Sequence, residues 1–208
     1  MKNILCFGDS NTWGLNPVDA SRHDRATRWP GVLAARLGDD YHVIEEGLAG
    51  RTTVRDDPNE AHKNGLTYLP PCLESHQPLD LVVLMLGTND LKHRFALSPR
   101  TVATSVQVLI DTVLSSPYGG NCKVPQVLLM APPHVVGLTA LTEMFVGAEE
   151  KSLGLAPLYA AVAHECGCHF LDAGPVAPVS PLDGVHLDSE SHTRLAEAVA
   201  IRVRAILG

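Results

Sequence analysis

Residues 80–86 read DLVVLML, an unbroken apolar run behind a single aspartate, and residues 124–131 read VPQVLLMA. Neither run shows the alternation of polar and apolar side chains that marks a strand with one face in water. Unbroken apolar runs of this length are typical of strands in a parallel sheet that is covered on both faces. The sequence therefore predicts two parallel strands, at Asp80–Leu86 and Val124–Ala131.

Further strands and helices alternate on either side of these two runs. Shorter apolar runs predict strands at Asn3–Phe7, Tyr41–Glu46 and His169–Asp172. Helical spacing, with capping residues at the ends, predicts helices at Trp29–Leu37, Ser98–Leu114, Pro157–Glu165 (continuing a helix begun near Ala148) and Ser189–Leu207. The alternation predicts an α/β fold of the flavodoxin-like kind, a three-layer α/β/α sandwich around a mainly parallel five-stranded sheet. No repeat or linker divides the sequence, so we expect residues 1–208 to form a single domain.

The charge and hydropathy of the sequence limit the kinds of molecule that the protein is expected to bind. The net charge of −7 comes from 23 acidic and 16 basic residues, and no basic block is present to neutralise a row of phosphates, so we expect no nucleic-acid partner. No apolar run approaches the roughly 18 residues of a membrane span, so we expect no membrane partner. The first apolar run stops at Gly8 and Asp9, too early for a secretory signal, and we expect a cytoplasmic protein.

The cysteines do not indicate a metal or a disulfide framework. Five are present, and in a chain without an export signal we expect reduced thiols. One cluster superficially resembles a metal site and comprises His164, Glu165, Cys166, Cys168 and His169. It lacks zinc-ribbon spacing and a second ligand pair, so we interpret it as a helix end passing into a strand and expect no metal.

Two long irregular stretches begin where predicted strands end. They span Asn11–Arg28 and Gly47–Asn64. In open parallel sheets, ligands bind beyond the carboxyl ends of the strands. The functional residues are therefore expected in these stretches and in the segments that follow the other strands.

Four short segments in these places carry residues with chemical potential. FGDSNTWG (7–14) offers Ser10, EEGLAGRTT (45–53) offers Gly47, LGTND (86–90) offers Gly87 and Asn89, and DGVH (183–186) offers Asp183 and His186. Together they resemble, in the same order, the four blocks of the GDSL/SGNH hydrolases. Residues 7–14, 44–53, 64–92 and 183–186 are most similar to the bacterial arylesterase/acyltransferase group of that family.

The chemistry of these residue types agrees with the resemblance. A serine hydroxyl becomes nucleophilic when a nearby base accepts its proton, and His186 can do so because imidazole titrates near neutrality. Asp183 would hold the other ring nitrogen and stabilise the imidazolium. The oxyanion formed on an ester carbonyl would be bound by the backbone N–H groups of Ser10 and Gly47 and by the side-chain amide of Asn89, each contributing about 2.7 to 4 kcal/mol.

Each of these residues also has a structural explanation when considered alone. Ser10 could be a helix cap, Gly47 a turn glycine, Asn89 another cap, and His186 one of ten histidines. Nothing structural requires those four types, in that order, after strands and before the last helix, so we favour catalysis. Asp9 lies beside Ser10, but in the family the acid is three residues before the histidine, so we interpret Asp9 as a turn-stabilising carboxylate.

Several neighbouring residues are expected to shape the pocket. Trp13 would line the acyl or alcohol pocket, with simple packing as the alternative. Lys92 would rim the mouth, with a solvated lysine as the alternative. Leu15 and Ala49 stand where the arylesterase-like relatives usually have tryptophan and serine, and Val185 would add an apolar wall. These differences affect the expected substrate range and leave the reaction type unchanged.

The resulting hypothesis is a serine esterase without a cofactor. It would hydrolyse short-chain acyl or aryl esters through an acyl-enzyme on Ser10 and also pass the acyl group to alcohols. A carbohydrate acetylesterase and a lysophospholipase remain open as alternatives, and so does a ligand-binding module on a hydrolase scaffold. The expected partner is a small-molecule ester, and the resemblance implies a homo-oligomer.

Overall fold

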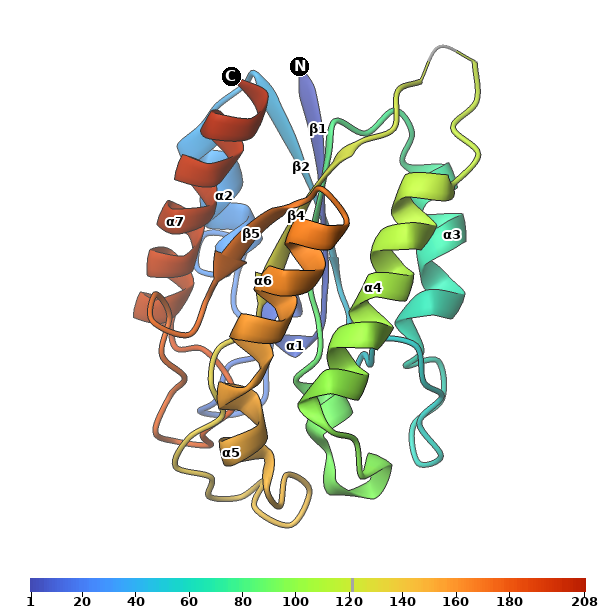
Figure 1. The fold of residues 1–208 in the computed structure, drawn as a ribbon. Helices are drawn as coiled ribbons and strands as arrows, with labels where there is room; N and C mark the ends of the chain where they lie inside the picture. The colour runs from blue at the N-terminus through green and yellow to red at the C-terminus, as the bar shows by residue number, and fades with distance from the viewer. Residues whose placement is uncertain (121) are drawn as a thin grey trace.

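The computed structural model describes residues 1–120 and 122–208, and its centre is a five-stranded sheet. The strands are β1 (Lys2–Gly8), β2 (Tyr41–Gly47), β3 (Leu81–Met85), β4 (Gln126–Ala131) and β5 (His169–Asp172). Their order is β2-β1-β3-β4-β5, and every neighbouring pair is parallel (Figure 1). The predicted α/β class and parallel sheet are confirmed.

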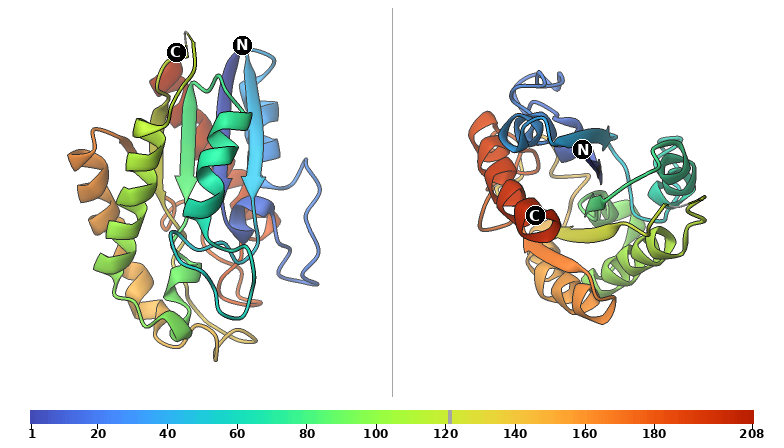
Figure 2. Two further views of the ribbon diagram at one scale, coloured as in Figure 1. Left: turned by 90° about the vertical axis from the view of Figure 1, so that its right-hand side faces the viewer. Right: turned by 90° about the horizontal axis from the view of Figure 1, so that it is seen from above.

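Helices cover both faces of the sheet. They are α1 (Ser10–Trp13), α2 (Trp29–Leu37), α3 (Gly65–Ser75), α4 (Pro99–Ser115), α5 (Ala148–Leu153), α6 (Leu155–Glu165) and α7 (Ser189–Leu207), with short 3-10 turns η1 (Asn89–Leu91) and η2 (His93–Phe95). Seen from above, α2 and α7 lie on one face, and α3, α4 and α6 lie on the other (Figure 2, right). The predicted three-layer sandwich is therefore confirmed.

The two faces explain why the strand sequences are continuously apolar. Successive side chains of a strand point to opposite faces. Leu5 and Phe7 of β1 join the core against α3, α4 and α6, whereas Ile4 and Cys6 join the core against α2 and α7. Because both faces are covered, no position in the middle of β1 is left for a polar residue.

Two features of the helices differ from the prediction. Helix α3 was not among the predicted elements, and its sequence contains Pro70 and Pro71. The expected continuous helix from Ala148 to Glu165 is two helices, α5 and α6, that meet at Gly154. Pro157 has no N–H to donate to the carbonyl of Leu153, so an unbroken helical ladder cannot pass through this point.

The carboxyl ends of the strands meet at one edge of the sheet. Gly8, the last residue of β1, lies in register with Gly47 of β2 and with Met85 of β3. In Figure 1 this edge is at the bottom, with α1 beside it, while both chain termini are at the opposite end. The segments that follow these strands are therefore neighbours in space. Among the helices described, none is long and apolar enough to cross a bilayer.

Candidate active site

Ser10 is presented by a tight turn between β1 and α1. Asp9 caps α1, with its Oδ1 accepting a hydrogen bond from the backbone N–H of Asn11 at 3.0 Å. This local bond turns the chain from strand to helix within one residue, which agrees with the predicted turn-stabilising role of Asp9. Ser10 is thereby held at the carboxyl edge of the sheet and is 5% exposed.

His186 and Asp183 lie next to Ser10, in the loop that precedes α7. The Nε2 of His186 is 3.0 Å from Ser10 Oγ, and its Nδ1 is 2.6 Å from Asp183 Oδ2. An ionised carboxylate can only accept, so Nδ1 carries the proton and Nε2 is left to accept from the serine hydroxyl. The structure therefore brings the three residues together in the relative arrangement that proton transfer from Ser10 requires.

The loop itself fixes the carboxylate of Asp183. Its Oδ1 accepts hydrogen bonds from the backbone N–H groups of Val185 and His186, both at 2.9 Å. Burial by itself would raise the pKa of Asp183, but the hydrogen bonds from the His186 side chain and from the two backbone groups lower it below 3.8. Asp183 thus stays ionised at neutral pH and oriented toward the imidazole.

Gly47 is at the end of β2, directly against α1. A Cβ at this position would lie 2.1 Å from the backbone nitrogen of Trp13. Only glycine, which has no Cβ, permits this approach. The strand end therefore reaches the helix that carries Ser10.

Asn89 opens the turn η1 after β3 and is 5% exposed. Its Nδ2 is buried and has no hydrogen-bond partner within the described parts of the chain. A buried donor without a partner is costly, which is expected where a ligand supplies the missing acceptor. Asn89 lines the same cavity as Ser10 and His186.

This cavity has a volume of about 220 Å³ and a lining that mixes apolar, small and charged residues. Its lining comprises Ser10, Leu15, Ala49, Gly50, Glu60, Lys63, Asn89, Lys92, Leu141, Met144, Phe145, Val185 and His186. Of the predicted pocket residues, Leu15, Ala49, Lys92 and Val185 are present.

Comparison with known families identifies the chain. The sequence matches the GDSL-like Lipase/Acylhydrolase family over residues 6–194. The protein belongs to this family. A comparison with curated proteins gives no match.

Solved structures of family members are similar over their whole length. The aryl esterase of M. smegmatis is 43% identical with a TM-score of 0.96, and each chain covers 100% of the other. Est24, a carbohydrate acetylesterase from Sinorhizobium meliloti, is 45% identical with a TM-score of 0.96 and the same coverage. A putative arylesterase from Agrobacterium tumefaciens is 42% identical with a TM-score of 0.93, again with complete coverage. The GDSL-like hydrolase described here is therefore an arylesterase-like carboxylic ester hydrolase.

Trp13 was predicted to line the acyl or alcohol pocket, with simple packing as the alternative. It is not among the residues that line the cavity of the GDSL-like hydrolase. Its half-buried ring lies beneath the guanidinium of Arg22, 5.1 Å from the ring centroid, and Arg22 Nε donates to the Trp13 carbonyl at 2.8 Å. These contacts hold Trp13 against the following loop, and its role in the pocket stays a prediction.

Lys92 lines the cavity but is not solvated. It is 2% exposed, and its Nζ lies 3.0 Å from Glu60 and 3.5 Å from Asp57. Arg94 also binds Asp57. A buried lysine requires such carboxylate partners. The resulting charged network fastens the loop after β2 to the turns after β3.

Some residues of the site were not singled out by their sequence. Leu141, Met144 and Phe145 come from the turns between β4 and α5, where no motif marks them. Lys63 donates to the carbonyl of Ala49 at 2.8 Å. Asn11 is buried next to Ser10 and contacts the His186 loop, and its position inside the GDSN segment was the available signal.

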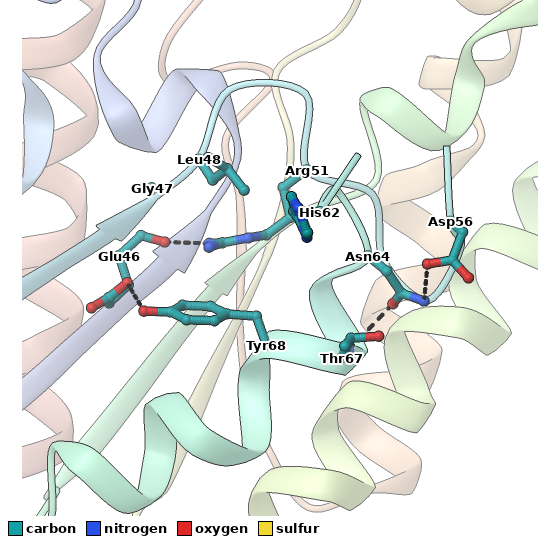
Figure 3. Close-up of a pocket in the computed structure, with 9 residues that line it drawn as sticks. All are labelled: Glu46, Gly47, Leu48, Arg51, Asp56, His62, Asn64, Thr67 and Tyr68. Carbon is teal, nitrogen blue, oxygen red and sulfur yellow. Dashed lines mark hydrogen bonds between the residues drawn. The ribbon is translucent and has the colours of Figure 1, made fainter. Parts of the chain in front are cut away.

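A larger cavity of about 490 Å³ lies beside the site and is drawn in Figure 3. It is lined by Glu46, Gly47, Leu48, Arg51, Asp56, His62, Asn64, Thr67 and Tyr68. Figure 3 shows the Glu46 carboxylate bonded to the Tyr68 hydroxyl, and the Arg51 guanidinium bonded to the Glu46 carbonyl. Gly47 lines this cavity, whereas Ser10 and His186 do not, so the smaller cavity is the candidate active site.

One group in the described residues has ligand atoms close enough to suggest a metal. Atoms of Glu46, Cys72 and His76 lie within 4.8 Å of one another. Glu46 already accepts from Tyr68 and contacts His76 Nε2 at 2.9 Å, and burial, together with the charge of Glu46, raises the pKa of Cys72 to about 12. The Glu46 carboxylate and the His76 ring of this group are thus already engaged in hydrogen bonds within the protein. The sequence from Cys166 to Cys168 is, as interpreted, the passage from the end of α6 to β5.

Proposed function

We propose that the protein is a serine esterase that cleaves short-chain acyl or aryl esters through an acyl-enzyme on Ser10. The observation that carries the proposal is the continuous contact from Asp183 through His186 to Ser10, at 2.6 and 3.0 Å. Such a chain of donor and acceptor is needed for nucleophilic catalysis and is not needed for ligand binding. It favours an enzyme over a binding module on a hydrolase scaffold.

In the first half-reaction, Ser10 Oγ bonds to the ester carbonyl carbon while its proton passes to His186 Nε2. Asp183 stabilises the imidazolium through Nδ1–H. The backbone N–H groups of Ser10 and Gly47, with the side-chain amide of Asn89, would donate to the oxyanion. The unpartnered Nδ2 of Asn89 supports its role, because the donor is already buried at the cavity.

Collapse of the tetrahedral intermediate breaks the bond to the alcohol oxygen, which takes the proton from His186. The acyl group remains on Ser10. In the second half-reaction, His186 removes a proton from water, whose oxygen bonds to the acyl carbon. The bond from that carbon to Ser10 Oγ then breaks, His186 returns the proton to Oγ, and the acid leaves. An alcohol that reaches the acyl carbon in place of water gives a new ester by the same steps.

The size of the cavity favours short acyl groups. Ligand pockets usually measure roughly 300 to 1,000 Å³, whereas this cavity measures about 220 Å³. Phe145, Met144 and Val185 give it an apolar wall suited to a small acyl chain or an aromatic ring. The small cavity favours a short acyl group over a long lipid chain, so a lysophospholipase is the weaker alternative.

A second candidate is deacetylation of sugars. Glu60 and Lys63 line the same cavity, and such charged groups would bind the hydroxyls of a carbohydrate leaving group. Est24, which is 45% identical, is described as a carbohydrate acetylesterase. Both candidates use the same acyl-enzyme and differ only in the alcohol.

Turnover by the purified protein tests the proposal. p-Nitrophenyl acetate should be hydrolysed with a burst of nitrophenol if acylation is faster than deacylation. Phenyl acetate and acetylated xylose, compared by kcat/KM, distinguish the aryl ester from the sugar ester. If none of the three esters is turned over, a ligand-binding module on a hydrolase scaffold becomes the favoured function.

A further inference from the structure

The side chain of Asn11 connects the serine turn to the histidine loop. It is the second residue of α1, directly after Ser10, and is 2% exposed. Its Nδ2 donates to the carbonyl of Val185 at 3.1 Å, and its Oδ1 accepts from the N–H of Leu187 at 3.0 Å. Both ends of the amide are therefore used, and the two partners, one acceptor and one donor, fix its orientation.

The two contacts are on either side of His186 in the sequence. The backbone of His186 is bonded within its own loop, its N–H to Asp183 Oδ1 at 2.9 Å and its carbonyl to the N–H of Ser180 at 2.7 Å. Those bonds shape the loop but do not tie it to α1. Asn11 ties it to α1, the element that carries the nucleophile, on both sides of the imidazole.

We propose that Asn11 is a positioning residue that sets the distance between His186 Nε2 and Ser10 Oγ. The inference rests on the proposed function, since it assigns the placement of its general base. The family name spells Gly-Asp-Ser-Leu, and this chain has Asn11 in the place of the leucine. Leucine has a similar volume but could make neither hydrogen bond. The link between α1 and the His186 loop therefore depends on the Asn11 amide of this chain.

The chemistry of the site requires both halves of the amide. An aspartate in place of Asn11 could accept from Leu187 N–H but could not, when ionised, donate to the Val185 carbonyl. Leucine would leave two buried backbone groups without partners, and the loop would move to satisfy them. A displacement of about 1 Å between reacting groups can lower the rate on the order of 100-fold.

The experiment compares Asn11→Leu and Asn11→Asp with the wild type on p-nitrophenyl acetate. Asn3→Leu is the matched control, because Asn3 also donates to a backbone carbonyl, that of Pro78, but at the opposite end of β1. We expect kcat to fall on the order of 100-fold in Asn11→Leu and at least about 10-fold in Asn11→Asp, with KM nearly unchanged. Asn3→Leu should keep the wild-type kcat.

A spectroscopic measurement separates positioning from general stability. The Nδ1 proton of His186, held against Asp183, should give a low-field proton NMR signal that broadens or shifts in both Asn11 variants. Variants with unchanged kcat and an unchanged signal would overturn the inference. So would a rise in KM alone, which assigns Asn11 to substrate binding, or unfolding of both variants, which assigns it to stability.

Ser10→Ala, measured in the same assay, distinguishes this inference from the proposed function. If Ser10→Ala is inactive and the Asn11 variants are fully active, only the positioning role fails. If Ser10→Ala is active, the proposed function fails first.

Discussion

His186 Nε2 lies 3.0 Å from Ser10 Oγ, although 176 positions separate the two residues in the sequence. The contact closes at the carboxyl edge of the parallel sheet, where the turn after β1 meets the loop before α7. It makes the two side chains parts of one proton-transfer unit with Asp183.

The losses in kcat caused by substitutions at Ser10 and His186 should not add. Each single variant, Ser10→Ala or His186→Ala, should lower kcat by about 10⁴-fold or more. The double variant should be about as slow as either single one, because the base has no role without the nucleophile. Steady-state kinetics on p-nitrophenyl acetate measures all three. Losses that multiply would show that one of the residues acts outside the unit.

Asp9 should make stability depend on pH. Burial raises its pKa from 3.8 to about 6, against the lowering effects of the Asn11 N–H and of the charges on His186 and Arg51. Because the pKa of Asp9 is higher in the folded state, its contribution to the free energy of unfolding is complete below pH 3.8. That contribution is lost as the pH rises through about 6. Between about pH 4 and pH 7, Asp9→Asn should therefore gain up to about 3 kcal/mol in free energy of unfolding relative to the wild type.

Urea denaturation at a series of pH values checks the Asp9 prediction. Asp39→Asn, an exposed carboxylate beyond α2, is the control and should show no such gain. A constant difference between Asp9→Asn and the wild type over the whole range would contradict the effect of burial.

Much of this arrangement could be predicted from the sequence, because the strands are parallel and their carboxyl ends must share an edge. Residues that follow those ends, such as Ser10 and Asn89, were therefore expected to be neighbours. Trp13 could not be placed in this way, since its ring direction depends on the contact with Arg22 across a loop. The cavity wall at Phe145 comes from turns without a motif, and only the folded chain brings it to Ser10.

The prediction of secondary structure from the sequence failed where prolines were involved. Pro70 and Pro71 lie inside α3, where a simple reading of helix propensity disfavours a helix. Packing of Leu69 and Leu73 into the core against α4 stabilises the helix, and this contribution is not visible locally. Before α6, a continuous helix was predicted where the structure has a break. Pro157 and Gly154 together mark this break, which helical spacing alone does not indicate.

Activity should not require a metal. The proposed mechanism uses only protein groups, and Glu46 is already hydrogen-bonded to Tyr68 and His76. The rate on p-nitrophenyl acetate should be unchanged after exhaustive dialysis against EDTA. A loss of activity that zinc restores would contradict this, and the variant His76→Gln would then locate the ion.

The preferred substrates should be short acyl esters, and alcohols should compete with water for the acyl-enzyme. The small cavity, which Leu15 and Val185 help to line, favours short acyl chains and offers apolar contacts to an alcohol near the acyl carbon. With vinyl acetate and benzyl alcohol in buffer, benzyl acetate should form first and be hydrolysed later. The Ser10→Ala variant is the control and should form none. Formation of acetate without any benzyl acetate would contradict the prediction. Faster turnover of octanoyl esters than of acetyl and butyryl esters would also contradict it.

The role of Ser10 as the nucleophile is tested by comparing the esterase activity of Ser10→Ala with that of Ser105→Ala. Both serines are 5% exposed, but Ser105 lies in α4 and donates to the carbonyl of Thr101, away from the site. We expect Ser10→Ala to fold as the wild type does and to lose p-nitrophenyl acetate turnover by about 10⁴-fold or more, while Ser105→Ala keeps it. A folded Ser10→Ala protein that is free of contaminating esterase and still turns over the ester would contradict this role.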